Sequence, residues 1–314
     1  MVRSLSGRCL VRFGETTYRC QVRGRLKQGP RQVQTVVVIG DRVLFRPLAD
    51  RSGPQTEVVE PAGIIEEVLP RRNKISRQAA RRSGGRVEQI LMANLDQIVA
   101  VQSLRDPPPQ TGFIDRLLVA AERFEVAGLL CLNKIDLVPA AERDDRWSYY
   151  ASLGYQVIQT SVVSREGVAE LQASLGHKIS LFLGASGVGK SSLLNTIQPE
   201  LRLRIAPVGE KTGLGKHTTT RSELFTLPNG GYLADSPGIR GFDPWDIAPD
   251  ALRGYFPDWL DPAQECRFRS CLHRDEPDCG VKKLVKTGSI PEWRHEAYLA
   301  ILRDLELKTD RPYR

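Results

Sequence analysis

The sequence predicts a chain of three parts: a small β-barrel, a larger α/β domain with a mostly parallel sheet, and a short cysteine-containing C-terminal domain. Short alternating segments, punctuated by Gly and Pro, fill the region 1–70 and are typical of small barrels. From about position 95, apolar strand-length runs alternate with helix-length segments, as in parallel sheets covered by helices. We therefore expect domain boundaries at 1–70, 71–94, 95–241 and 242–314, with helices at 113–124 and from about 292 to 307.

The barrel is predicted from alternation of apolar and polar residues. In the segment 18–23 the alternation is strict, so one face of that strand is buried and the other carries arginine. Five or six short strands in this length fit an OB-fold best. The strand candidates are residues 9–13, 18–23, 33–39, 42–45, 56–59 and 64–69.

Positive charge is concentrated at the N-terminal end. Residues 1–94 contain 18 Lys and Arg against 8 Asp and Glu, whereas residues 95–314 contain 27 against 29. Such an excess belongs either to a solvated basic surface or to a surface that binds an anion such as nucleic acid, and we favour the second. The stretch 71–94 is basic and low in apolar residues, so we expect a mobile connector or a segment that orders on an anion.

Composition excludes several classes of protein. Hydrophobic residues make up 41 % and charged residues 26 %, which is ordinary for a soluble globular chain. No apolar run approaches the roughly 18 residues of a membrane helix, and the N-terminus lacks the core of a signal peptide. We expect a cytoplasmic protein with no membrane partner, in which the six cysteines are thiols or metal ligands.

The strongest motif is a complete G-x-x-x-x-G-K-S phosphate loop, placed between the predicted strand 179–183 and a helical run at 191–197. Its backbone N–H groups can face one anion, and the helix N-terminus adds positive potential. Lys190 can reach the β- and γ-phosphates, and the Ser191 hydroxyl can bind Mg²⁺. The expected nucleotide contacts in this segment are Gly184, Ala185, Ser186, Gly187, Val188, Gly189, Lys190, Ser191 and Ser192.

A second motif, Asn133-Lys134-Ile135-Asp136, follows the predicted strand 128–132. Asp136 can accept hydrogen bonds from guanine N1–H and the exocyclic amine, which adenine does not present in that arrangement. The Lys134 stem can cover the base, and Asn133 can fix the loop. Beside a phosphate loop this motif predicts guanine specificity, and the backbone of Thr160 and Ser161 is a further candidate contact to the base.

Two later segments contain the candidates for metal binding and hydrolysis. Asp235 ends a predicted strand and is expected to hold the Mg²⁺ water shell, while the Gly238 amide can sense the γ-phosphate. In the segment 213–221 either Thr219 or Thr220 can complete the Mg²⁺ shell. His217 is the candidate for positioning the attacking water beside Lys190 and Gly238, with an RNA-contacting switch residue as the alternative.

The C-terminal region contains Cys266-x₄-Cys271-x-His273-x₅-Cys279. Three thiols and an imidazole in the short segment 266–279 suit a closed tetrahedral zinc site of the structural kind. The remaining cysteines, Cys9, Cys20 and Cys131, lie in strand patterns and are expected to be buried apolar residues.

The order of these motifs is unusual, because the base-reading segment 133–136 precedes the phosphate loop, whereas most GTPases have the reverse order. This order, with a basic barrel before it and a Cys-Cys-His-Cys cluster after it, resembles the family of bacterial ribosome small-subunit-dependent GTPases. The resemblance implies a circularly permuted P-loop GTPase domain with an N-terminal OB-fold barrel and a C-terminal zinc-binding domain.

The resemblance also implies a function: a cytoplasmic GTPase that uses GTP/GDP with Mg²⁺, contains one structural Zn²⁺, and acts in late maturation of the small ribosomal subunit. It implies that hydrolysis is slow alone and stimulated by that subunit. Its partners would be the subunit and its rRNA, and we expect a monomer. The alternatives are a non-catalytic RNA-binding assembly factor gated by guanine nucleotide, and a GTPase of RNA modification, although residues 1–94 and 242–314 hold no evident second catalytic site.

Overall fold

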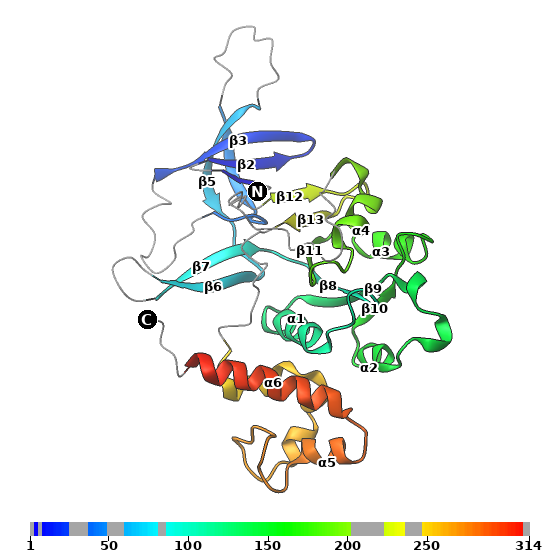
Figure 1. Ribbon diagram of the computed structural model, residues 1–314. Helices are drawn as coiled ribbons and strands as arrows, with labels where there is room; N and C mark the ends of the chain where they lie inside the picture. The colour runs from blue at the N-terminus through cyan, green and yellow to red at the C-terminus, as the bar shows by residue number, and fades with distance from the viewer. Residues whose placement is uncertain are drawn as a thin grey trace.

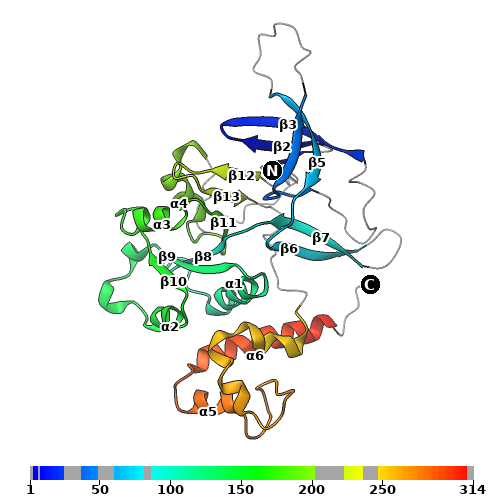
Figure 2. The same ribbon diagram turned by 180° about the vertical axis from the view of Figure 1, so that it is seen from behind.

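The computed structural model describes residues 3–5, 8–24, 37–48, 60–80, 86–201, 223–235 and 247–309. The N-terminal strands lie at one end of the molecule and the C-terminal helices at the other, with the α/β domain between them (Figures 1 and 2). The two accessory parts therefore attach to different sides of the central domain. No described helix has both the length and the apolar character needed to cross a membrane.

The central domain is built on a mostly parallel sheet in the order β10-β9-β8-β11-β13-β12. Every pair in this order is parallel except β12 and β13, which are antiparallel. The predicted α/β architecture is thereby confirmed. The strands are β8 (Gln97–Ser103), β9 (Ala127–Asn133), β10 (Gln156–Gln159), β11 (Ile179–Leu183), β12 (Glu223–Thr226) and β13 (Tyr232–Asp235).

Helices cover both faces of this sheet because its central strands are apolar on both sides. Successive residues of β8 enter two different cores, with Ile98 in one and Val99 in the other. The first core contains side chains of α1 and α2, and the second contains side chains of α3 and α4. These helices are α1 (Thr111–Arg123), α2 (Arg146–Ser152), α3 (Val168–Ser174) and α4 (Lys190–Ile197).

The N-terminal strands extend the same sheet beyond β12. Arg3 pairs with Glu223 across β1 and β12, and β2, β3, β5 and β4 follow in that order. Four predicted strands are confirmed, whereas 56–59 lies outside the described residues, and of 33–39 only 37–39 is described, with Ile39 in a bridge to Met92. The strand order of the described residues runs from β1 to β4 without a pairing that closes it, so the barrel and its OB type stay predictions. The strands are β1 (Arg3–Leu5), β2 (Arg8–Phe13), β3 (Thr16–Val22), β4 (Val43–Pro47) and β5 (Ala62–Val68).

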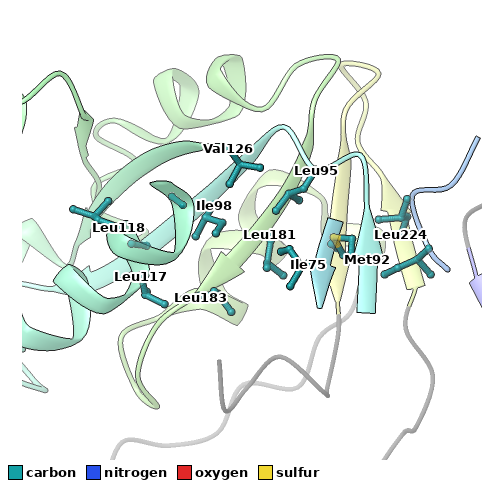
Figure 3. Close-up of a cluster of buried hydrophobic side chains, with 14 of the residues drawn as sticks. Ile75, Met92, Leu95, Ile98, Leu117, Leu118, Val126, Leu181, Leu183 and Leu224 are labelled. Carbon is teal, nitrogen blue, oxygen red and sulfur yellow. The ribbon is translucent and has the colours of Figure 1, made fainter. Parts of the chain in front are cut away.

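In place of the mobile connector expected at 71–94, the described residues of this segment contain regular strands, and ordering on an anion stays a prediction. The segment forms an antiparallel ribbon of β6 (Lys74–Ala80) and β7 (Arg86–Ala93). Ile75 and Met92 are buried and join the core of the central domain, beside Leu95 and Leu181 (Figure 3). The high arginine content of the segment concealed these alternating apolar positions, which anchor the ribbon.

The C-terminal unit, residues 247–309, combines short 3₁₀ turns with two helices. Its core includes Val119 of α1, so it packs directly on the central domain. The predicted C-terminal helix is confirmed. The elements are the 3₁₀ turns η6 (Pro249–Tyr255), η7 (Pro257–Trp259) and η8 (Pro262–Glu265) and the helices α5 (Gly280–Lys286) and α6 (Glu292–Thr309).

Candidate functional site

The phosphate loop lies where β11 ends and α4 begins. Two of its glycines have no room for a side chain: a Cβ at Gly184 would lie 2.3 Å from the Val101 carbonyl oxygen, and one at Gly189 would lie 2.3 Å from Asn133 Nδ2. Gly189 also has a φ of 93°, which side chains rarely adopt. The Lys190 ammonium lies within the loop and donates hydrogen bonds to the carbonyl oxygens of Gly184 and Ala185, at 2.8 and 2.7 Å. The phosphate loop therefore surrounds the Lys190 ammonium, the group that the motif predicts to contact phosphate.

Asn133, at the end of β9, connects the phosphate loop to the segment that follows β10. Its amide nitrogen donates to the Val188 carbonyl oxygen at 2.9 Å, and its amide oxygen accepts from the Thr160 hydroxyl at 3.2 Å. All the side-chain atoms involved are buried, with Asn133 1 % exposed and Thr160 fully buried. Buried hydrogen bonds of this kind fix the geometry of both partners, so the two loops are held as one unit.

The Asp136 carboxylate is oriented by a neighbouring hydroxyl. Ser161 donates to Asp136 Oδ1 at 2.5 Å, and the same Ser161 oxygen accepts from the backbone N–H groups of Val163 and Ser164. Lys134 adopts the left-handed conformation with φ 61°, and its ammonium donates to the Asp106 carbonyl oxygen. Asp136 and the Lys134 stem thus belong to one braced turn at the carboxyl edge of the sheet.

The structure brings together the sequence-predicted residues that follow β9, β10 and β11. Ser191 and Ser192 lie in the first turn of α4, and Ser186 is exposed at the tip of the phosphate loop. Asp235 ends β13, and its side chain is not among those described. Four further candidates, His217, Thr219, Thr220 and Gly238, lie outside the described residues.

Two arginines that the sequence did not single out also contact this site. Arg105 Nη1 donates to the Leu137 carbonyl oxygen at 3.0 Å, and Arg143 contacts the same turn and the last residue of β10. Their partners are backbone carbonyls and one amide, which leave no signature in a motif. A sequence signal for such contacts is therefore absent.

The four predicted metal ligands form one cluster in the C-terminal unit. Their ligand atoms all lie within 4.8 Å of one another. The Sγ atoms of Cys266 and Cys279 are 3.8 Å apart, and His273 Nδ1 lies 3.5 and 3.3 Å from them. A tetrahedral zinc with Zn–S bonds of about 2.3 Å places its sulfurs about 3.8 Å apart. The residues Cys266, Cys271, His273 and Cys279 therefore fit a zinc ion.

The surroundings of the cluster also favour a metal. Burial, helped by the positive charge of Arg253, lowers the pKa of His273 to about 4, so its imidazole is neutral, as a ligand must be. Backbone N–H groups of Gly280 and Lys282 point at the sulfurs of Cys266 and Cys279, at 3.3 and 3.4 Å. Such donors stabilise thiolate charge. By contrast, Cys9, Cys20 and Cys131 are buried in the strands β2, β3 and β9, as predicted.

The phosphate loop and the turn 133–136 are joined through Asn133 on one parallel sheet and lie in permuted chain order. This arrangement is that of a circularly permuted P-loop GTPase. The profile of the RsgA GTPase family matches residues 68–245. The chain belongs to this family.

Relatives that match along most or all of the chain support the same assignment. The small ribosomal subunit biogenesis GTPase RsgA of Caldanaerobacter subterraneus is 34 % identical over all of this chain and 97 % of its own, and that of Chlorobaculum parvum is 40 % identical over 86 % of each. Among solved structures, YjeQ from Thermotoga maritima matches with a TM-score of 0.76 at 34 % identity, covering 97 % of this chain and 96 % of its own. YloQ, described as a circularly permuted GTPase, matches with 0.72 at 28 %, covering 100 and 95 %.

Membership of this family confirms the predicted resemblance and the permuted GTPase fold. It also decides between the function classes left open by the sequence. The protein is a GTP hydrolase, not a non-catalytic assembly factor.

Proposed function

We propose that this GTPase acts in the maturation of the small ribosomal subunit, hydrolysing GTP to GDP and phosphate with stimulation by that subunit. The observation that carries the proposal is the full-length match to relatives named small ribosomal subunit biogenesis GTPases. The braced phosphate and base loops supply the chemistry such a protein needs. Cytoplasmic location and a monomeric state belong to the same proposal.

In this proposal the nucleotide lies along the carboxyl edge of the sheet. Asp136 accepts from the guanine N1–H and amine, Lys134 covers the base, and Asn133, Thr160 and Ser161 hold the surrounding backbone. The phosphate groups face the N–H groups of 184–192, and the Lys190 ammonium exchanges its carbonyl partners for phosphate oxygens. Ser191, Asp235 and one of Thr219 and Thr220 would hold Mg²⁺, which neutralises charge on the β- and γ-phosphates when bound.

Hydrolysis requires a positioned water, and the proposed residues for this are His217 and the Gly238 amide. Ile239 follows Gly238 where many GTPases have a water-orienting glutamine, and isoleucine cannot hydrogen-bond water. Slow turnover of the isolated protein follows. In this proposal the small subunit accelerates that turnover.

The proposed rRNA contact is the N-terminal barrel. The positive excess of the chain lies in residues 1–94, and Phe13, at the β2–β3 turn, is 69 % exposed. Phe13 rests edge-to-face on Phe45, with ring centroids 6.3 Å apart. An exposed aromatic ring among arginines is a platform for an unpaired base, since every base has a face that can stack.

Zinc is proposed as a structural ion held by Cys266, Cys271, His273 and Cys279. When bound, it cross-links the loop 266–279 and stabilises the fold of the unit. Its closed ligand set leaves no open position for substrate. The zinc is therefore assigned to architecture and not to hydrolysis.

The decisive experiment measures GTP turnover of the purified protein alone, with purified small subunits and with large subunits as the control. We expect slow turnover alone, strong acceleration by small subunits, and no acceleration by large ones. The acceleration should fall as salt rises, because phosphate contacts release counterions. Equal turnover under all three conditions would refute the proposed partner while leaving the GTPase assignment intact.

Base choice is tested separately by Asp136→Asn. Hydrogen bonds to a charged group contribute roughly 1.5–3 kcal/mol each, so GDP affinity should fall by orders of magnitude. Affinity for xanthosine diphosphate should rise, because its ring presents a carbonyl where guanine presents the amine. Fluorescence titration with both nucleotides measures this, and unchanged GDP affinity would remove Asp136 from the base site.

A further inference from the structure

We propose that Arg143 is a positioning residue for guanine recognition, which it serves by fixing the turn that contains Asp136 to the segment that contains Ser161. Arg143 directly follows the 3₁₀ turn η3 (Ala140–Glu142). The proposal rests on the base-reading role proposed above for Asp136. It adds a residue outside the base-reading motif to the determinants of nucleotide specificity.

The Asp136 turn has carbonyl oxygens that its own backbone does not fully satisfy. It is a single 3₁₀ turn, η2 (Ile135–Leu137), in which the Ile135 oxygen accepts one backbone hydrogen bond, from the Val138 N–H at 3.2 Å, and the carbonyls at the end of so short a helix need external donors. The guanidinium of Arg143 donates from Nε to the Val138 oxygen at 3.3 Å and from Nη2 to the Ile135 oxygen at 3.4 Å. It therefore contacts the turn on both sides of Asp136.

The third donor of Arg143 makes the shortest contact. Nη1 donates to Gln159 Oε1 at 2.7 Å, and Gln159 is the last residue of β10. The chain continues through Thr160, whose carbonyl oxygen accepts from the Ile135 N–H at 3.3 Å, to Ser161. Since Ser161 donates to the Asp136 carboxylate, the contacts close a ring that passes from the turn through Arg143 and β10 back to Asp136.

A rigid planar guanidinium suits this task because its donors diverge in one plane toward three acceptors. The three donors of a lysine ammonium radiate from a single atom and not from a planar fork, so they match this spread of acceptors less well. Arg105, which is exposed, donates to the Leu137 oxygen at 3.0 Å and supports the same turn from outside the ring. Loss of Arg143 would leave Asp136 attached to Ser161 but would free the turn to shift.

The consequence is specific to guanine. Asp136 must receive two parallel hydrogen bonds, one from N1–H and one from the exocyclic amine, so a shifted turn weakens the pair. Inosine nucleotides lack the exocyclic amine and make only the first bond. Misplacement of Asp136 should therefore cost GDP more affinity than IDP, whereas general loosening of the domain would weaken both nucleotides alike.

The test compares GDP and IDP affinities of the full-length protein by fluorescence titration for Arg143→Ala and Gln159→Leu. For Arg143→Ala we expect GDP binding about tenfold weaker and IDP binding about threefold weaker, as for partial loss of charge-assisted hydrogen bonds. Gln159→Leu removes only the hydrogen bond between Arg143 and β10. It should weaken the binding of GDP and of IDP in the same direction, each by a smaller factor. The KM for GTP should rise while kcat without ribosomes stays within about twofold, because no phosphate contact is altered.

Two comparisons make the outcome decisive. Arg146→Ala is the matched control, since Arg146 lies three positions along the chain, pairs with Asp144, and lies over the Trp293 ring. It should leave the GDP to IDP ratio unchanged. An unchanged ratio in both Arg143→Ala and Gln159→Leu, or an equal loss of both nucleotides, would overturn the positioning role. If Asp136→Asn itself left GDP affinity unchanged, the proposed base site would fail instead.

Discussion

The N-terminal barrel and the C-terminal unit flank the same GTPase domain but are attached to it in different ways. The barrel continues the sheet at one strand pair, Arg3 with Glu223, and Arg12 adds a hydrogen bond to the Thr226 hydroxyl at 2.5 Å. Buried side chains of β2, β3 and β5 also lie in one hydrophobic cluster with α1 and the central strands. The C-terminal unit packs on α1 through a second, separate core and surrounds a buried cation. Charge differs as well: residues 247–309 contain 10 Lys and Arg against 11 Asp and Glu, with no positive excess.

The buried cation is Arg294 of α6, which is 1 % exposed. It forms ion pairs with Asp115 of α1 and with Asp258 of η7, and its guanidinium lies 4.3 Å from the Phe256 ring centroid. Tyr150 of α2 donates to the same Asp115 at 2.8 Å. A paired cation among these partners fixes one arrangement, so the C-terminal unit moves with α1 and α2. The comparison separates two proposed roles: the predicted barrel would supply positive charge for RNA, and the C-terminal unit would supply rigid placement.

The largest expected effect is loss of the metal. Zinc binding contributes roughly 10–16 kcal/mol to the folding of small sites, so Cys271→Ser should abolish zinc content and loosen residues 247–309. Hydrogen exchange should then increase in that unit and not in the barrel. Cys9→Ala is the control and should retain zinc. Zinc retained in Cys271→Ser, or an equal increase of hydrogen exchange in the N-terminal strands, would contradict the separate roles of the two flanking parts.

The next effect tests the buried cation. Arg294→Met leaves two buried carboxylates without their cation, and removal of one member of a buried pair costs about 3–5 kcal/mol. Urea unfolding measures the loss. Arg274→Met is the matched control, because Arg274 pairs with Glu306 of the same helix at an exposed position and should cost under about 1 kcal/mol. Similar losses for both variants would show that the attachment does not depend on the buried pair.

A smaller effect is expected on the barrel side. Phe13→Ala should weaken small-subunit binding about tenfold, as for loss of one stacked base, with stability unchanged within about 0.5 kcal/mol. Leu260→Ala removes another exposed apolar side chain, 53 % exposed, from the C-terminal unit and should not alter binding. Co-sedimentation with subunits measures both. If the two variants behave alike, Phe13 is an ordinary surface residue.

The smallest effect concerns single charges. Arg46→Gln, on β4, should reduce the slope of log affinity against log salt by about one if that side chain contacts a phosphate. Arg267→Gln in the C-terminal unit is its counterpart, because each arginine is exposed and paired with one carboxylate. Titrations at several salt concentrations should show a change for Arg46 alone. A larger change of this slope for Arg267→Gln than for Arg46→Gln would show that the C-terminal unit, and not the N-terminal strands, contacts the phosphates.

Local patterns in the sequence predicted the elements that obey local rules. The phosphate loop, the base-reading turn, α1, α4 and α6 each depend on spacing within one segment, and all are helices or turns of the structure. The four zinc ligands likewise lie within the single short segment 266–279. Their clustering was predictable because the chain has little freedom between them.

Contacts between distant segments could not be predicted in the same way. Arg294 and Asp115 are separated by 179 residues, and Arg12 and Thr226 by 214, so neither pair leaves a local pattern. Arg143 binds backbone oxygens, which every residue offers. The ribbon of β6 and β7 was missed for another reason. Arginines dominate its composition, and only a few apolar side chains, among them Ile75 and Met92, anchor it in the core.

The permuted order of the sheet has a mechanical consequence. In the order β10-β9-β8-β11-β13-β12, the chain enters the GTPase domain at β8 and last crosses its sheet at β13, and these are the two neighbours of the phosphate-loop strand β11. A displacement of β8 or β13 would therefore reach the phosphate-loop strand directly through its hydrogen bonds, whereas β10 lies two strands beyond β8. In the proposed role on a ribosomal particle, strain that entered the sheet at these strands would act on the phosphate side of the nucleotide site first.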